Sequence, residues 1–158
     1  MREILFRGKR CDNGEWVQGF YVRADHHWHK HGIHKDWIAL GASANGGWFA
    51  LHNKYAVKAE TVGQYTGLTD KNGKKIFEGD VVKAVIVRDL GGGKETRTET
   101  GIIGYDKIGM IGLIAKYAGI IPVWSDFFQE LTLSGCINDF WFEIIGNIHD
   151  NPELLENP

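Results

Sequence analysis

The feature that most constrains this chain is a series of short segments in which apolar and polar residues alternate, separated by glycine-containing turns. Trp16, Gln18, Phe20 and Val22 share one face of such a segment, because strand side chains point alternately to opposite sides. The preceding Asn13-Gly14 pair is a strong hairpin signal, since both residue types tolerate positive φ. We therefore predict an N-terminal β-hairpin over residues 2–23.

Further strands are predicted along the chain. Residues 81–87 are apolar on both faces, which is typical of a central strand, and Asn72-Gly73 marks a turn before it. Residues 91–99 are expected to form a mobile loop, and residues 100–106 the strand that returns from it. Short strands are expected over 37–40, 48–51, 54–60 and 140–148, a polar loop or exposed strand pair over 24–36, a flexible turn over 41–47 and a short helical turn over 151–155. The stretch 107–119 fits either a helix or a strand, and we favour a strand because each of its glycines would cost a helix roughly 1 kcal/mol.

The composition supports this β-rich interpretation. The chain has 158 residues, of which 43% are apolar and 24% charged, and it contains 21 glycines but only 3 prolines. These values exclude disorder, collagen and a pure coiled coil. A composition shift near residue 60 suggests a loop-rich part over 1–60 and a regular β part over 61–158, unless the two form one integrated domain.

Charge and apolar patterning bear on the environment of the protein. No run of 18 apolar residues is present, so no membrane span is expected, and the charged start lacks the apolar core of a secretory signal. Cys11 and Cys136 form no disulfide framework, which indicates a cytosolic protein with reduced thiols. The net charge of −2 and pI of about 6.4 disfavour non-specific binding to nucleic acid. These values do not exclude a local basic patch.

Three blocks of the sequence resemble the YopX family, whose members are encoded by temperate phages and prophages. The central block runs from Val62-Gly-Gln-Tyr-Thr-Gly-Leu-Thr-Asp-Lys-Asn-Gly-Lys74 through Ile76-Phe-Glu-Gly-Asp-Val-Val82. The first block is Met1-Arg-Glu-Ile-Leu-Phe-Arg-Gly8 with Asn13-Gly-Glu-Trp-Val17. The last is Glu143-Ile-Ile-Gly-Asn-Ile148 with Asn151-Pro-Glu-Leu-Leu155. The match covers both termini and the middle of the chain, in the order of the family.

The resemblance implies a mainly β fold with an SH3-like small barrel and little helix, and it carries no recognised catalytic or binding residue onto this chain. The residues agree with such a barrel, to which the N-terminal hairpin and extra short strands would be added. Glu78-Gly79-Asp80 is expected to form a sharp turn before a buried strand, because Asp and Gly favour bends. The alternative, in which Glu78 and Asp80 act as paired carboxylates on one strand face, is the weaker interpretation.

A histidine cluster is the sharpest chemical feature. Five histidines lie within nine positions: His26, His27, His29, His31 and His34. On a strand, His27, His29 and His31 would share a face and could bind zinc, nickel or copper, with Asp25 or Asp36 as a neighbouring carboxylate. An exposed polar loop that binds no metal explains the same residues more simply. We therefore expect no functional metal and no cofactor, and keep the three-histidine site as the alternative.

Other motifs favour structural roles. The Gly-rich stretch 90–98 lacks the P-loop spacing and is predicted to be a hairpin tip. The stretch 69–75 is predicted to be a solvated turn rather than a phosphate contact. Neither cysteine belongs to a recognisable nucleophilic arrangement. The tryptophans are expected to be mainly core, with Trp28 and Trp48 as candidate interface anchors; the full set is Trp16, Trp28, Trp37, Trp48, Trp124 and Trp141.

These observations favour a phage or prophage accessory protein of the bacterial cytoplasm. It would not be an enzyme but a module that binds an unidentified macromolecule, which could be a second copy of itself. A nucleic-acid-binding module is the first alternative, on the analogy of small barrels, and would need exposed aromatic residues within a basic groove. A metal-dependent activity of the histidine cluster is the second.

Overall fold

The computed structural model describes residues 3–25, 34–45, 48–89, 93–105, 111–115, 119–122 and 139–155. These residues are mainly β, as the sequence predicts, and their helical segments are two short 3₁₀ turns. The chain divides into two compact units, Met1–Tyr65 and Thr66–Pro158, with the division inside one strand.

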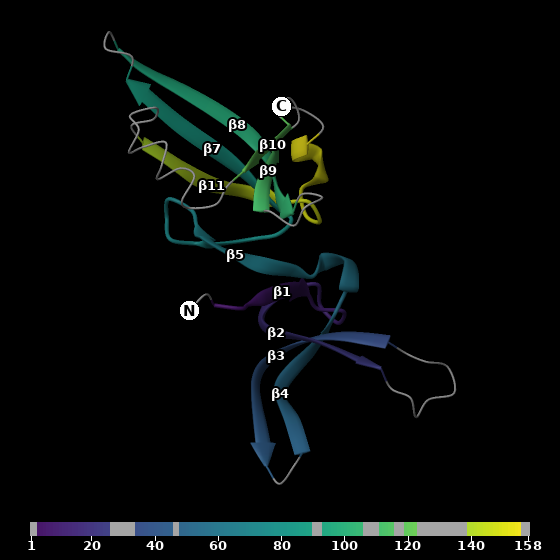
Figure 1. Cartoon of the computed structure of the whole chain (residues 1–158). Helices are drawn as coiled ribbons and strands as arrows, with labels where there is room; N and C mark the ends of the chain where they lie inside the picture. Colours follow the sequence, from purple (N-terminus) through teal and green to yellow (C-terminus); the bar gives the residue numbers. More distant parts are fainter. Residues whose placement is uncertain are drawn as a thin grey trace. The chain divides into compact units, whose positions relative to one another are not determined.

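The N-terminal unit is an antiparallel sheet (Figure 1). Its strands follow the order β4-β3-β2-β1-β5. The predicted hairpin is confirmed, since Lys9 lies opposite Trp16 and Gly14 has a φ of 73° at the turn. The elements are β1 (Phe6–Lys9), β2 (Trp16–Asp25), β3 (His34–Asn45), β4 (Trp48–Val57), the 3₁₀ turn η1 (Ala59–Thr61) and the first part of β5 (Gly63–Thr69).

The predicted turn over 41–47 is wrong over most of its length. Gly41 to Asn45 continue β3, and β4 runs unbroken from Trp48 to Val57. Gly41 lies opposite His52 and Asn45 opposite Trp48, so the small residues are held by a regular ladder. Pairing with a neighbouring strand outweighs the weak strand propensity of Gly, Ala and Ser, because the ladder satisfies their backbone groups.

The first four strands curl around an apolar interior. Ile38 and Val57 are buried, and a Cβ on Gly8 would lie 3.1 Å from Val57 Cβ. The backbone N–H of Cys11 donates to the Ala56 carbonyl at 2.9 Å, so the chain just after β1 meets the end of β4. Gly8 is therefore needed where two strands approach closely, and one side of the sheet faces inward.

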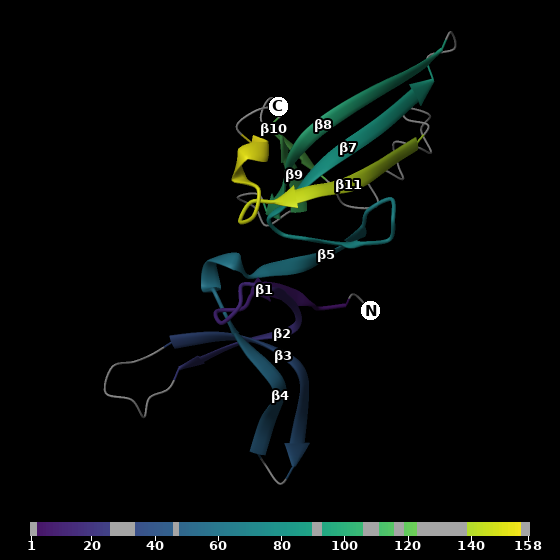
Figure 2. The ribbon, with the colours of Figure 1, turned by 180° about the vertical axis from the view of Figure 1, so that it is seen from behind.

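The C-terminal unit contains the remainder of β5 and a second antiparallel sheet, in the order β10-β9-β8-β7-β11. Figure 2 shows β11 alongside β7 in this unit. Its core includes Ile76, Val82, Ile103 and Phe142. The elements are β6 (Lys75–Phe77), β7 (Asp80–Asp89), β8 (Lys94–Tyr105), β9 (Ile111–Ala115), β10 (Gly119–Pro122), β11 (Asp139–Asn147) and the 3₁₀ turn η2 (Pro152–Leu155).

Most strand predictions for this unit are confirmed. β7 lies between β8 and β11, as expected for a strand that is apolar on both faces. The loop predicted over 91–99 is too long, because β8 begins at Lys94, which lies opposite Asp89 at the end of β7. Thr96, Thr98 and Thr100 suit a strand through their branched Cβ atoms.

The SH3-like barrel is not confirmed. In the part of the chain that the structure describes, the strand order of each sheet is open, and β10 and β11 are the two edges of the five-stranded sheet. An open sheet must protect its edges in other ways, because unpaired strand backbone is a site of aggregation.

The β5–β6 turn covers part of the exposed edge of β11. The backbone N–H of Lys71 donates to the Phe142 carbonyl at 2.9 Å, and Lys71 Nζ lies 2.9 Å from Glu143 Oε2. The Asp70 carboxylate accepts the N–H of Asn72 at 2.8 Å and of Lys74 at 2.9 Å. Burial alone would raise the pKa of Asp70, but hydrogen bonds from the N–H groups of Lys74, Asn72 and Ile144 outweigh it, so the pKa is lowered. One buried side chain thus shapes the turn and holds it to β11.

Gly19→Ala is expected to destabilise the protein by about 1–3 kcal/mol, the usual cost of overpacking. A Cβ at this position would lie 2.3 Å from the Ala39 carbonyl oxygen. Because that atom belongs to the backbone, β2 or β3 has to move. Urea unfolding monitored by circular dichroism measures the change, with Gln18→Ala at the exposed neighbouring position as the control. Equal midpoints for Gly19→Ala and the control would contradict this packing.

Asp70→Asn is expected to lower the free energy of unfolding at pH 7 by about 1.5–3 kcal/mol, because hydrogen bonds to a charged acceptor are lost. Since the folded pKa is depressed, the contribution of the carboxylate is present above the unfolded value of about 3.9 and disappears as the pH falls through the folded value.

The difference between wild type and Asp70→Asn should therefore shrink when urea unfolding is repeated below about pH 3.9. Glu95→Gln removes an exposed acid of β8 and serves as the control. An Asp70→Asn variant as stable as wild type at pH 7 would refute the proposed role of the turn.

Candidate interaction surface

The predicted histidine site falls outside the described residues. This applies to His26, His27, His29 and His31, whereas His34 begins β3 in register with Asp25 and only its backbone is described. The three-histidine metal site remains a prediction. Among the described residues, no group of His, Cys, Asp and Glu could hold a metal ion.

Asp36, one of the two carboxylates considered beside the histidines, has a structural partner. It is buried on β3, and the Tyr21 hydroxyl donates a hydrogen bond to its Oδ1. This hydrogen bond is the main reason that the pKa of Tyr21 is raised. The Tyr21 ring also lies against Phe6, with 5.5 Å between ring centroids. Asp36 thus links β3 to β2.

Two turns of the central block, the β5–β6 turn and the turn at Glu78-Gly79-Asp80, have structural roles in the C-terminal unit. The β5–β6 turn covers part of the edge of β11. At the other turn, Gly79 has a φ of 78° and Asp80 is 1% exposed. Asp80 accepts the Phe77 N–H at 2.8 Å and lies 3.5 Å from Asn147 Nδ2. The central and last blocks are therefore joined by hydrogen bonds that fix the start of β7 against the end of β11.

Some of the remaining candidate residues belong to the described part of the chain, and the others lie outside it. In the described part, Cys11 is exposed, and Lys94 to Thr98 of the Gly-rich stretch belong to β8. Cys136, Trp28, Trp124 and the side chain of Trp48 lie outside it. The tryptophans with described side chains are each partly rather than fully buried: Trp16, Trp37 and Trp141.

The register of the N-terminal sheet places basic and aromatic side chains on one face. Lys9 lies opposite Trp16, Val22 opposite Trp37, and Ala39 opposite Lys54. Directly opposed residues share a face, and this face is opposite to the one that carries Ile38 and Val57. We call it the basic–aromatic face; its described members are Arg7, Lys9, Trp16, Gln18, Phe20, Val22, Trp37, Ala39, Lys54 and Ala56.

Cations lie over aromatic rings at two places on this face. Arg7 Cζ is 4.7 Å and Lys9 Nζ 5.6 Å from the centroid of the Trp16 ring. Lys54 Nζ is 5.0 Å from the centroid of the Trp37 ring. These separations fall within the range of cation–π attraction. Among these cations Arg7 is buried, Lys9 is partly buried and Lys54 is exposed.

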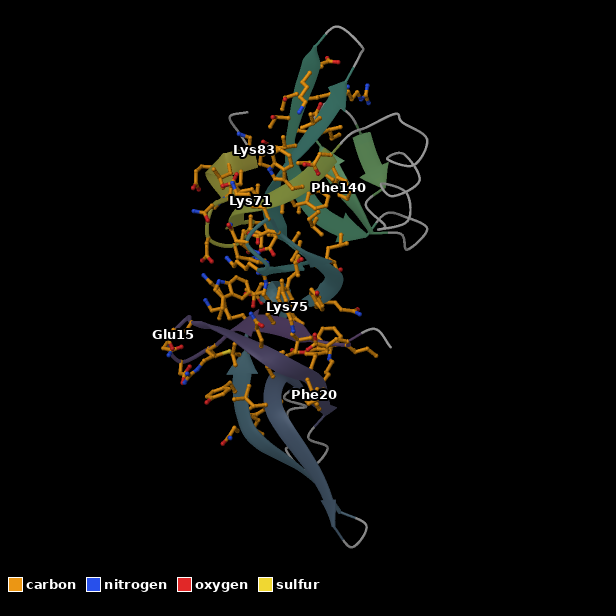
Figure 3. All side chains as sticks on the ribbon, turned by 90° about the vertical axis from the view of Figure 1, so that its left-hand side faces the viewer. Glu15, Phe20, Lys71, Lys75, Lys83 and Phe140 are labelled. Atoms are coloured by element: carbon orange, nitrogen blue, oxygen red, sulfur yellow. The ribbon has the colours of Figure 1, made fainter. Side chains whose placement is uncertain are left out.

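Phe20 is the most exposed of the large apolar residues on this face. It lies on β2 in the row Phe20–Ala39–Lys54 and is 55% exposed (Figure 3). Ala39, between them in the row, is fully buried, while Lys54 is exposed. None of the described members of the face is acidic. An exposed ring beside exposed positive charge can therefore contact a partner that is both flat and anionic.

The charge of the chain is distributed unevenly between the units. Residues 1–65 contain nine Lys and Arg against six Asp and Glu, a formal net charge of +3. Residues 66–158 contain nine against fourteen, a net charge of −5. The overall value of −2 conceals this asymmetry. Counting charge by unit, together with the alternation in β2, is the sequence signal that could have pointed to this face.

Comparisons with known proteins agree with the fold. No curated protein matches the chain. Among solved structures, the crystal structure of protein EF1440 from Enterococcus faecalis is similar, with a TM-score of 0.51 and 22% identity over 98% of this chain and 99% of that one. In the described part, no helix has the length and apolar character needed to cross a membrane.

The family resemblance noted from the three sequence blocks is also established by a family-wide comparison. The model of the YopX protein family matches residues 5–156, which is nearly the whole length. This chain therefore belongs to the YopX family.

Proposed function

We propose that this protein is a non-enzymatic binding module of a phage or prophage, acting in the bacterial cytoplasm, and that it binds a macromolecule through the basic–aromatic face. The single observation that carries the proposal is the 55% exposure of Phe20 on a face whose described members include cations but no acids. Single exposed apolar side chains are common, and Leu40 is 50% exposed on the other face. What distinguishes Phe20 is that its ring lies in one row with the exposed Lys54.

The placement of the face on regular strands favours binding. Phe20 and Lys54 belong to paired strands, so their backbones are already ordered before a partner arrives. A preorganised surface loses less conformational entropy on association than a mobile loop does. Tryptophan, which lies beside cations at two places on this face, is also among the residue types that contribute most at interfaces.

The candidate acidic residues support a module without catalysis. Asp36 accepts from Tyr21, and Asp80 accepts from the Phe77 backbone. They belong to different units, and each has a role in holding strands together. Their hydrogen bonds explain why these side chains are buried without assigning them a chemical step.

Affinity capture from a lysate of host bacteria tests this proposal. We expect the full-length protein to retain a partner, and Phe20→Ser to reduce its recovery at least fivefold, the effect of losing roughly 1 kcal/mol or more of binding energy. Leu40→Ser is the matched control, because Leu40 is 50% exposed on the other face of the same sheet.

Light scattering on the purified protein tests self-association in parallel. A wild-type dimer that Phe20→Ser dissociates would identify a second copy as the partner. A monomer that retains no macromolecule, or a partner recovered equally by wild type and Phe20→Ser, would refute the proposal. Thermal melts establish that each variant is folded.

A further inference from the structure

We infer that the partner of the basic–aromatic face is a single strand of nucleic acid. The inference rests on the proposed function and names the class of macromolecule. It is based on three features of the described members of the face: an exposed ring, cations near it and the absence of acidic residues.

The arrangement of charge favours a polyanion. Lys9 and Lys54 lie on different strands of one face, so an extended anion could contact both. The N-terminal unit carries a net charge of +3, whereas the C-terminal unit carries −5 and would repel phosphates. An anionic chain would therefore be directed to the N-terminal unit.

The exposed ring favours nucleic acid over an acidic protein segment. Every base has a flat π-face that can stack on an aromatic side chain, and such stacking is independent of sequence. Phe20 offers a ring without a charge or hydrogen-bonding group of its own, in the same row as Lys54. A base could stack on Phe20 while a neighbouring phosphate contacts Lys54.

The same argument favours a single strand over a duplex. In a duplex the bases are stacked on one another and their π-faces are not accessible, so only unpaired bases can lie on Phe20. A sheet with aromatic residues on one face is a known way of presenting stacking platforms to unpaired bases.

Fluorescence anisotropy with the full-length protein tests the inference. The probe is a labelled oligothymidylate of about 20 nucleotides, long enough for one binding site, at salt concentrations from about 50 to 200 mM. With two phosphate contacts, from Lys9 and Lys54, we expect the logarithm of affinity to fall with the logarithm of salt with a slope of about −1.4.

Two substitutions separate stacking from charge. Phe20→Ala should weaken binding at least about fivefold, because one stacked base is lost, and should leave the salt slope unchanged. Lys54→Gln should weaken binding and make the slope shallower by about 0.7. Leu40→Ala and Lys94→Gln, at exposed positions outside this face, should leave the affinity within about twofold.

Competitors identify what is recognised. Duplex DNA and inorganic polyphosphate should each compete at least about fivefold less well than the unlabelled strand, because neither offers a free base. Equal competition by polyphosphate, no binding at about 50 mM salt, or no effect of Phe20→Ala would overturn the inference.

Failure of this inference is distinguishable from failure of the proposed function. If the oligonucleotide does not bind but a protein is captured in a manner that requires Phe20, the face binds a protein and only the nucleic-acid inference falls. If neither assay depends on Phe20, both fall.

Discussion

The hydrogen bonds of two buried aspartates determine how the C-terminal unit is held together. Asp70 shapes the β5–β6 turn, and the backbone of that turn bonds to the edge strand β11. Asp80 fixes the start of β7 and reaches Asn147 at the end of β11. An open sheet with an exposed edge needs such protection. The central and last sequence blocks of the family therefore supply the contacts on which this sheet depends.

This constraint separates structural residues from candidate binding residues. In the central block, the carboxylates of Asp70 and Asp80 accept hydrogen bonds from backbone groups, and the Lys71 side chain pairs with Glu143. The N-terminal sheet has a different character, because its outer face exposes Phe20 and carries cations over two tryptophan rings. The structural contacts of the C-terminal unit and the proposed binding surface of the N-terminal sheet therefore involve different residues, as expected if function resides in sites rather than in folds.

The sequence predicts the strands of this protein better than its surfaces. Alternation and the two Asn-Gly turns located the N-terminal hairpin and the β5–β6 turn, because these signals are local. They failed at Gly41 to Asn45 and Lys94 to Glu99, where pairing with a neighbouring strand overrides composition. The basic–aromatic face was missed because its members come from separate strands, and only the register shows that Phe20 and Lys54 share one row.

Amide-resolved NMR of the full-length protein, with and without the oligothymidylate, tests the central division of roles most directly. The account predicts that chemical shifts change at residues 7–9, 16–22, 37–39 and 54–56, which carry the basic–aromatic face, while residues 70–74 and 142–147 are unchanged. Changes concentrated at residues 70–74, with none around Phe20, would show that the turn is the recognition element and would contradict the account.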